Sequence, residues 1–353
     1  MKAAKWYGRN DVRIEEVSED YVLKPNQVRL KVFFAGICGT DLHEYNSGPI
    51  SIPVKKPHPL TNVKAPVILG HEMSGKVVEV GDLVTRVKAG DRVAVCPIIG
   101  CQTCYLCKAG LMGLCEKVAF LGLSWEGGAF SSYVTVYDYM CYKLPQNVSY
   151  EAGALVEPLS ATVRAIKQGR LKSGETVVII GAGPIGLMAI QSSIILGAKK
   201  VIVVEKFENR RKIAIKMGAS IAIDPAHKNL NELISELTDG AVADLVIECA
   251  GRNDSGLLAT KLARTKGRVV IMGVFEKPEL IDFTDIVYGE KTVIGSMGGY
   301  GEYDNTIKMI AAGNFNINLM ITGKISLEEI IEKGFLELIE HKKENIKILI
   351  SLF

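Results

Sequence analysis

The chain has 353 residues, about the length of two domains, and 48% hydrophobic and 23% charged residues, as in a soluble globular enzyme. A net charge of +3, without a long basic run, argues against nucleic acid as a partner. No secretory signal is visible, and glycine, proline and polar residues interrupt the most apolar stretch, 177–198. We therefore expect no membrane span and a cytoplasmic location, with the eight cysteines as metal ligands or free thiols.

The first part of the chain, to about residue 157, is predicted to be mostly β. Its polar insertion at 46–64 holds four prolines, with a fifth just after it at Pro66. Such an insertion is either a rigid lid over a site or a surface excursion. Short runs of β-branched and aromatic residues predict strands at Val28–Phe34, Val77–Val80, Arg92–Cys96 and Tyr133–Val136.

Within this part, residues 36–43 read Gly-Ile-Cys-Gly-Thr-Asp-Leu-His. They place a thiol at Cys38, between Gly36 and Gly39, with a hydroxyl at Thr40 and an imidazole at His43 just after it. Such a turn can present a soft metal ligand beside two groups that pass a proton.

Further candidate ligands follow downstream. His71 and Glu72 stand in a Gly-His-Glu sequence, and Glu157 lies in the apolar phrase Leu-Val-Glu-Pro-Leu. A carboxylate in an apolar phrase requires a partner, and a metal is one. Because adjacent residues of a regular strand point to opposite faces, Glu72 is either a direct ligand or a supporting residue behind the ligands.

Four cysteines occur at short spacing in a glycine-containing loop. Four thiolates in the pattern C-x2-C-x2-C-x7-C can close a tetrahedral zinc shell without an open position, which is a structural site. An iron–sulfur cluster or free surface thiols are the alternatives. The four residues are Cys101, Cys104, Cys107 and Cys115.

After residue 157 continuous apolar runs alternate with amphipathic segments, which indicates a doubly wound parallel sheet. Pro158 suits the first turn of a helix that continues to Gln168. Six strands are expected at Thr176–Ile180, Val201–Glu205, Ala219–Ile223, Asp244–Cys249, Arg268–Met272 and Thr292–Ser296. Helices are expected at Ile185–Leu196, Glu208–Met217, Leu230–Leu237 and Ser255–Ala263.

Beyond residue 297 mixed α and β patterns return and end in a strand at Lys347–Ile350. There is no room for a third core, so this tail is expected to pack on the first domain. The predicted fold class is α/β, with a mostly-β catalytic domain of residues 1–157 and 297–353. A doubly wound, six-stranded Rossmann domain of residues 158–296 would bind the nucleotide.

The expected first turn of this second domain carries the pattern G-x-G-x-x-G between a strand and a helix, which is the context that makes the pattern specific. The alternative is an ordinary strand-to-helix turn. Glu205 follows nineteen positions after the last glycine, where an acid accepts hydrogen bonds from a ribose diol. The residues of the motif are Gly181, Ala182, Gly183, Pro184, Ile185 and Gly186.

The residues near the end of the second strand of this domain give opposite indications of the cofactor, NAD or NADP. Glu205 favours NAD, because its charge would repel a 2′-phosphate. Lys206, Arg210 and Arg211 follow it, and arginine suits phosphate binding, so NADP remains possible. We expect NAD, because the strand end fixes the position of Glu205, whereas basic side chains on a helix can point elsewhere.

Together, the Cys38, Thr40 and His43 turn, the Gly-His-Glu sequence, the four-cysteine loop and the glycine-rich motif resemble the zinc-dependent medium-chain dehydrogenases in order and spacing. The likeness covers essentially the whole chain and implies a GroES-like catalytic domain. It implies that Cys38 and His71 hold a catalytic zinc, and that Thr40 and His43 relay a proton. Glu157, where the alcohol dehydrogenases have a cysteine, and the insertion are similar to the (R,R)-butanediol dehydrogenase or acetoin reductase branch. Several members of that branch lack the four-cysteine loop.

The resemblance implies an enzyme that interconverts acetoin or diacetyl and 2,3-butanediol with NAD(H), holding two zinc ions per chain, one catalytic and one structural. Another secondary-alcohol or polyol substrate, of the sorbitol or threonine type, is the nearest alternative. A non-catalytic NAD(P)-binding member would have lost zinc ligands that this chain keeps. The strand at Thr292–Ser296 is expected to be an edge that needs cover, where family members pair as homodimers or homotetramers.

Overall fold

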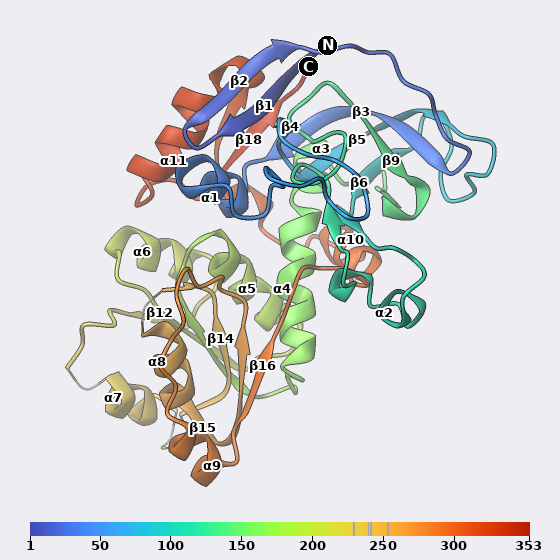
Figure 1. Cartoon of the computed structure of the whole chain (residues 1–353). Coiled ribbons are helices and arrows are strands. Elements are labelled where there is room, and N and C mark those ends of the chain that lie inside the picture. The colour runs from blue at the N-terminus through green and yellow to red at the C-terminus, as the bar shows by residue number, and fades with distance from the viewer. Residues whose placement is uncertain (229, 239, 241, 253) are drawn as a thin grey trace. The chain divides into compact units, whose positions relative to one another are not determined.

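The computed structural model describes every residue of the chain except 229, 239, 241 and 253. Within these residues, no helix combines the length and the apolar character needed to cross a membrane. The chain forms two compact units, and residues 297–302 and 313–320, which we expected in the first domain, belong to the second unit. The limits of the folding domains themselves stay a prediction. The first unit holds Met1–Glu157, Tyr303–Ala312 and Ile321–Phe353, and the second holds Pro158–Glu302 and Gly313–Met320 (Figure 1).

A seven-stranded sheet forms the centre of the first unit. Its strand order is β10-β6-β5-β3-β18-β17, with β9 also paired to β3. One row of side chains on the long strand β3, formed by Val28, Leu30 and Val32, is fully buried in the core, as expected of alternate residues on one face of a strand. The strands are β3 (Gln27–Gly36), β5 (Glu72–Val80), β6 (Arg92–Val95), β9 (Tyr133–Tyr137), β10 (Cys141–Lys143), β17 (Ile321–Ser326) and β18 (Lys347–Ser351).

Two smaller sheets, β2-β1-β4 and β7-β8, complete the β structure described in this unit. Trp6, Leu69, Phe130 and Phe335 are among its largest fully buried side chains. The strands of the smaller sheets are β1 (Lys2–Gly8), β2 (Asp11–Glu16), β4 (Val67–Ile68), β7 (Ile98–Ile99) and β8 (Ala119–Phe120). The helical segments are α1 (Gly39–Ser47), α2 (Tyr105–Lys108), η1 (Met112–Leu114), η2 (Asp138–Met140), α3 (Tyr150–Ala154), α10 (Tyr303–Ala311), η4 (Leu327–Glu329), the π-helical η5 (Ile330–Leu336) and α11 (Glu337–Glu340).

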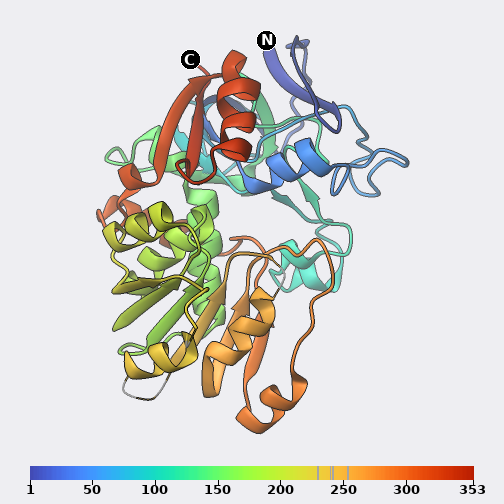
Figure 2. The ribbon, with the colours of Figure 1, turned by 90° about the vertical axis from the view of Figure 1, so that its left-hand side faces the viewer.

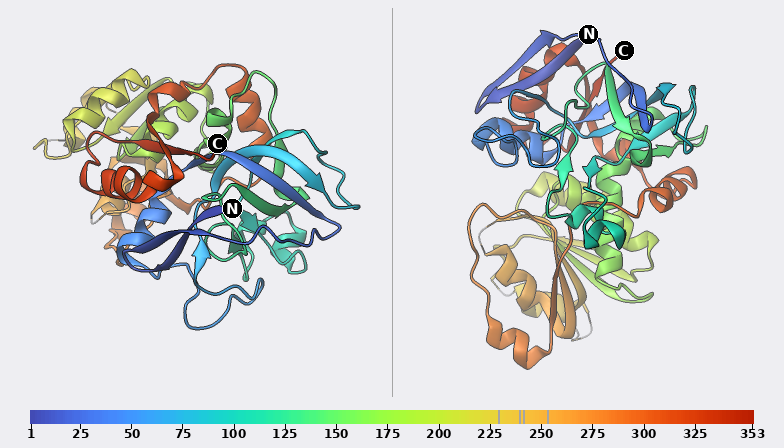
Figure 3. Two further views of the ribbon diagram at one scale, coloured as in Figure 1. Left: turned by 90° about the horizontal axis from the view of Figure 1, so that it is seen from above. Right: turned by 45° about the vertical axis from the view of Figure 1, so that its right-hand side comes forward.

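The C-terminal tail ends in the first unit, where β18 lies between β3 and β17 (Figure 2). It runs parallel to β17, with Lys347 opposite Ile321, and antiparallel to β3, with Leu349 opposite Gly36. Both chain termini therefore belong to the first unit (Figure 3). The return of the tail brings residues from the end of the chain next to the segment that leads into Cys38.

The second unit is built on a parallel sheet of six strands in the order β13-β12-β11-β14-β15-β16, which confirms the predicted doubly wound class. The order reverses between β11 and β14, so ligands are expected at the carboxyl ends of these two strands. The strands are β11 (Thr176–Ile180), β12 (Lys200–Val204), β13 (Ile221–Ile223), β14 (Ala243–Glu248), β15 (Ala263–Ile271) and β16 (Thr292–Gly295). The helical segments are α4 (Val156–Gln168, entering from the first unit), α5 (Pro184–Ile195), α6 (Glu208–Lys216), α7 (Leu230–Glu236), α8 (Ser255–Leu262), α9 (Phe283–Gly289) and η3 (Ile317–Leu319).

Candidate functional site

The glycine-rich segment 181–186 leads from β11 into α5 at the point where the strand order reverses. Gly181 has a φ of +92°, a conformation that glycine adopts without strain. A Cβ on Gly186 would lie 1.9 Å from the carbonyl oxygen of Gly181, so a larger residue would push helix and turn apart. Gly183 caps α5 and Pro184 is its first residue. The free amides of this helix N-terminus therefore offer a site for a pyrophosphate.

Glu205 follows the last residue of β12 and is 6% exposed. Its carboxylate accepts hydrogen bonds from the amide of Ala182, at 2.7 Å, and from the amide of Phe207, at 2.8 Å. The carboxylate is thereby fixed against the glycine-rich turn. This is the place from which an acid at the end of the second strand binds ribose hydroxyls in this type of fold.

The two arginines of α6 differ in what they contact. Arg211 donates from Nη1 to the carbonyl oxygens of Glu205 and Lys206, at 2.8 and 2.7 Å, and to the carboxylate of Asp224 at 2.9 Å. Arg210 instead directs Nη1 towards the turn, 3.8 Å from where a Cβ on Gly183 would stand. Arg211 therefore supports the end of β12, and Arg210 is the arginine placed next to the predicted nucleotide site.

In the first unit, one nitrogen of His71, Sγ of Cys38 and one carboxylate oxygen of Glu72 lie within 4.8 Å of one another. A sulfur, a nitrogen and an oxygen ligand form a donor set suited to zinc. We expected a turn around Cys38; the residue instead caps the N-terminus of α1, with its own amide donating to the carboxylate of Asp41 at 2.9 Å. Gly70, with a φ of +91°, supplies the irregular backbone that lets His71 and Glu72 turn towards the same site.

Two buried polar atoms at this site have no hydrogen-bond partner among the described residues. They are Nδ1 of His71 and Oδ1 of Asp41, which face each other at 3.7 Å. Burial lowers the pKa of His71, but Asp41 and Cys38 outweigh burial and hold that pKa well above its ordinary value. A buried imidazole beside a thiol and three carboxyl groups is an electron-rich pocket that fits a divalent cation.

Glu72 is fully buried and does not stand alone. The ammonium of Lys347 donates to both of its carboxylate oxygens at 2.7 Å and to the carbonyl oxygen of Ile37 at 2.9 Å. Burial lowers the pKa of Lys347, but Glu72, together with Cys38 and Glu157, more than compensates, so the pKa of Lys347 is raised. Glu72 therefore has a partner that is not a metal.

Glu157 stands in the first turn of α4, beside the fully buried Leu155, Val156 and Leu159. It is not among the atoms that lie within 4.8 Å of one another around Cys38. Burial raises the pKa of its carboxyl to about 7, and the neighbouring His71 opposes that shift. A carboxyl group desolvated in this way needs a nearby cation to stay charged. Glu157 thus fits the border of the candidate metal site but is not part of its compact group.

The four cysteines of the predicted structural site come together as expected: Sγ atoms of all four lie within 4.8 Å of one another. Backbone amides donate to these sulfurs, among them the amide of Cys104 to Cys101 Sγ at 3.3 Å and that of Lys117 to Cys115 Sγ at 3.4 Å. The hydroxyl of Thr103 bonds to Cys101 and lowers the pKa of that thiol to about 5. Amides and hydroxyls that point at sulfur favour thiolates, so this loop fits a metal with four sulfur ligands.

Comparison with known proteins agrees with this geometry. Residues 24–146 match the alcohol dehydrogenase GroES-like domain, and residues 184–312 match the zinc-binding dehydrogenase domain. The (R,R)-butanediol dehydrogenase of Bacillus subtilis is 40% identical over 99% of both chains. The chain belongs to the zinc-binding alcohol dehydrogenases.

One further relative and one solved structure show the range of the likeness. A probable D-xylulose reductase A of Aspergillus clavatus is 35% identical over 98% of the chain and 94% of the relative. The crystal structure of the 2R,3R-butanediol dehydrogenase from Bacillus subtilis superposes with a TM-score of 0.94, covering 100% of this chain and 99% of the other. The predicted family, the GroES-like and Rossmann folds and the oxidoreductase class are thus confirmed.

The proline-rich insertion of this dehydrogenase is fixed at several points. The buried carboxylate of Glu44, on α1, accepts from the amides of residues 50–52. Further along, Nε2 of His58 lies 3.1 Å from the carbonyl oxygen of Val118, and the hydroxyl of Thr61 donates to the carbonyl oxygen of Ser124 at 2.7 Å. The insertion is therefore bound to the segment that follows the four-cysteine loop. Whether it also covers a site stays a prediction.

Our reasoning from sequence missed three residues of the site: Asp41, Glu44 and Lys347. Asp41 could have been found from the sequence, because an acid three residues after the helix cap Cys38 completes a capping box. The only signal for Glu44 was its place on the same helix. Lys347 had none, because it is 275 positions away from Glu72.

Proposed function

We propose that this zinc-binding alcohol dehydrogenase interconverts acetoin, or diacetyl, and 2,3-butanediol by hydride transfer with NAD(H). The observation that carries the proposal is the compact group of Cys38, His71 and Glu72 donor atoms in a chain that also has a dinucleotide turn. The identity of 40% to the Bacillus subtilis enzyme over nearly the full length supports the choice of substrate.

Cys38, His71 and Glu157 are the residues proposed to hold the catalytic zinc, with Glu72 behind them. Zinc bound there would supply a Lewis acid for the carbonyl oxygen, and a bound nicotinamide would supply the hydride. The Cys38 thiolate and the Glu157 carboxylate together balance the charge of a divalent ion. Asp41 fixes Cys38, the N-cap of α1, by accepting a hydrogen bond from its amide.

Thr40 and His43 are proposed to move the proton. The hydroxyl of Thr40 lies 3.7 Å from Sγ of Cys38, close to where a substrate oxygen would approach the metal. His43 is three positions further along α1, on the same side of the helix, and it is exposed. Reduction of the ketone consumes one proton, which these two groups can pass inwards from solvent, and oxidation of the diol returns it by the same route.

A substrate panel tests this proposal. We expect kcat/KM for acetoin with NADH, and for 2,3-butanediol with NAD, to exceed the values for sorbitol, xylitol and threonine. The likeness to the probable D-xylulose reductase favours a polyol as the second candidate substrate. Higher kcat/KM for xylitol or sorbitol than for butanediol would replace the first candidate by the second.

The four-cysteine loop is proposed to hold a second, structural zinc, because four sulfur ligands leave no position for substrate. We expect two zinc ions per chain by metal analysis, one for each of the two ligand groups. Cys104→Ser should lower Tm by about 10 °C, since such a metal contributes folding free energy. The KM for acetoin of the folded variant should stay unchanged. A single zinc ion, with all four thiols alkylated in the native protein, would contradict the assignment.

A homodimer, or a tetramer built from such dimers, is proposed on the face of the second unit that holds α9 and β16. β16 is at the end of the strand order and is largely exposed. Phe283, Val287 and Tyr288 on α9 are each at least 67% exposed. An exposed edge strand and an exposed apolar helix face both need cover.

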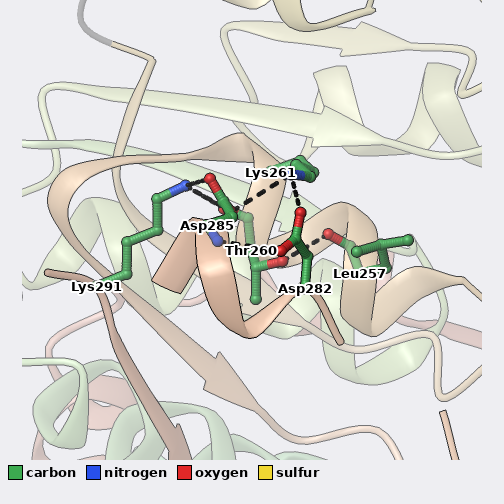
Figure 4. A network of polar contacts seen from close by, with 6 residues as sticks. All are labelled: Leu257, Thr260, Lys261, Asp282, Asp285 and Lys291. Atoms are coloured by element: carbon green, nitrogen blue, oxygen red, sulfur yellow. Dashed lines mark hydrogen bonds and ion pairs between the residues drawn. The ribbon is translucent and has the colours of Figure 1, made fainter. Parts of the chain in front are cut away.

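The polar network in Figure 4 holds α9 in place beneath that face. Lys291 donates to both carboxylate oxygens of Asp285 at 3.0 Å and to the carbonyl oxygen of Thr260 at 2.8 Å. Lys261 on α8 pairs with Asp282, the cap of α9, at 2.7 Å. The apolar side chains of α9 are thus presented on a helix that is tied to α8.

Val287→Asp is therefore expected to weaken self-association by about 10²-fold or more, because a charge buried without a partner costs several kcal/mol. Light scattering with size-exclusion chromatography over a range of concentrations measures the effect. Ile215→Asp, on the exposed side of α6, is the matched control and should not change the oligomer. A monomeric wild-type protein, or equal effects of both changes, would refute this interface.

A cytoplasmic location and NAD as the preferred cofactor stay predictions. None of the eight cysteines forms a disulfide bond, which suits a reducing compartment. Glu205 favours NAD for the reason of charge given above.

A further inference from the structure

The ion pair between Lys347 and Glu72 has no part in the chemistry proposed above, yet it lies at the metal site. Lys347 is 2% exposed and Glu72 is fully buried. Burying two charges is costly unless they are paired well, and removing one partner leaves the other charge uncompensated. Such a pair requires an explanation at a place where an apolar pair would also fill the space.

Glu72 lies next to two of the proposed metal ligands. One of its oxygens lies within 4.8 Å of Cys38 Sγ and of a His71 nitrogen, close enough for the three atoms to share a metal ion. Its carboxylate is instead engaged through both oxygens by Lys347. A Cβ on Gly36 would stand 2.2 Å from Glu72 Oε2, so the glycine leaves the space that the carboxylate occupies.

Charge balance points the same way. A divalent ion with the Cys38 thiolate and the Glu157 carboxylate is already neutral. A further carboxylate ligand would add a negative charge, fill the position that a substrate oxygen needs and weaken the metal as a Lewis acid. The ammonium of Lys347 balances Glu72 without the metal.

We propose that Lys347 is a positioning residue, which holds the Glu72 carboxylate outside the ligand shell of the metal and so keeps one coordination position free for the substrate. The inference rests on the catalytic metal site proposed above. Lys347 also donates to the carbonyl oxygen of Ile37, which fixes the ammonium relative to the residue before Cys38. The C-terminal strand β18 is therefore needed to set the coordination of a metal whose proposed ligands lie in the first half of the chain.

Lys347→Met tests the inference in the purified protein loaded with Co²⁺ as a spectroscopic probe for zinc. Freed Glu72 should enter the shell, and the visible cobalt absorption should weaken and shift as the coordination number rises. Release of zinc to a chelator should slow by about tenfold or more, the size of effect known for residues behind metal ligands. Turnover should fall, with KM for the nucleotide unchanged.

The double variant Lys347→Met with Glu72→Gln separates positioning from folding, because it removes both charges together. Its cobalt spectrum and zinc release should resemble those of the wild type. Lys347→Gln, which keeps a hydrogen-bond donor without the charge, serves as the second single variant if Lys347→Met does not fold. Lys324→Met removes an exposed lysine from the adjacent strand β17, where it pairs with Glu151, and should leave both readouts unchanged.

The outcomes distinguish the two proposals. If the wild-type protein holds no metal that depends on Cys38, the proposed function fails. If it does, and the folded single lysine variants keep the wild-type cobalt spectrum, Lys347 does not position Glu72. A double variant as altered as the single one also overturns the inference, because the effect then does not pass through Glu72.

Discussion

Cys38→Ser and His71→Ala are each expected to lower kcat/KM for acetoin by about 10³-fold or more. The proposed Lewis acid is worth several kcal/mol of transition-state stabilisation, and each 1.4 kcal/mol is about a factor of ten in rate. Cys38 and His71 stand with Glu72 in the compact donor group, so either change removes a proposed ligand. The measurements are steady-state kinetics and metal content of each purified variant.

NADH binding provides the internal control for this prediction. The glycine-rich turn and Glu205 belong to the second unit, whereas Cys38 and His71 belong to the first. The Kd for NADH, followed by fluorescence, should therefore stay within about twofold of the wild-type value, well below the tenfold that 1.4 kcal/mol would produce. Cys141→Ser makes the same change of thiol to hydroxyl at a buried cysteine of β10 and should keep its activity. Near-normal turnover in Cys38→Ser would show that Cys38 is not a ligand.

The parallel sheet was predictable because its strands carry the information locally. Five of the six lie within about two residues of where they were predicted. Among them, β11, β12 and β14 are buried along almost their whole length, as their continuous apolar runs indicate. β15 is the exception: it starts at Ala263, directly after α8 ends at Leu262, and not at Arg268 as predicted. The charged residues Arg264 and Lys266 interrupt the apolar pattern there. Gly181 and Gly186 were equally predictable. A positive φ at Gly181 and a close backbone approach at Gly186 favour glycine in any sequence.

The residues of the candidate metal site could be predicted from the sequence, but their partners in distant parts of the chain could not. Cys38, Thr40 and His43 form one motif, and His71 and Glu72 form another. What Glu72 does depends on Lys347, and no local pattern joins two residues that lie 275 positions apart. Arg210 was predicted to contact the cofactor, and that stays a prediction, but the contacts of Arg210 and Arg211 could not be predicted, for a related reason. Two adjacent helix positions differ by about 100° around the axis, and their partners depend on tertiary structure.

The geometry of Arg210 and Arg211 now sharpens the choice of cofactor. Arg211 is committed to the end of β12 and to Asp224, so it does not approach a phosphate without leaving three acceptors. Arg210 is directed towards Gly183, beside the predicted nucleotide site. Glu205 lies in a fixed place beside the turn and would repel a 2′-phosphate. A 2′-phosphate would thus meet the fixed negative charge of Glu205 and the positive charge of one arginine, Arg210. We expect NADH to be preferred over NADPH.

Glu205→Ser is expected to shift the ratio of kcat/KM for NADPH to that for NADH by about 10²-fold towards NADPH, because like charges in contact cost several kcal/mol. Adding Arg210→Gln to this variant should remove most of the gain with NADPH if Arg210 binds the phosphate. Glu208→Ser removes an exposed carboxylate of α6 that pairs with Lys212, and it should leave the ratio unchanged. Steady-state kinetics on acetoin with each cofactor measure the ratios. A wild-type enzyme that is faster with NADPH would show that Arg210, and not Glu205, decides the cofactor.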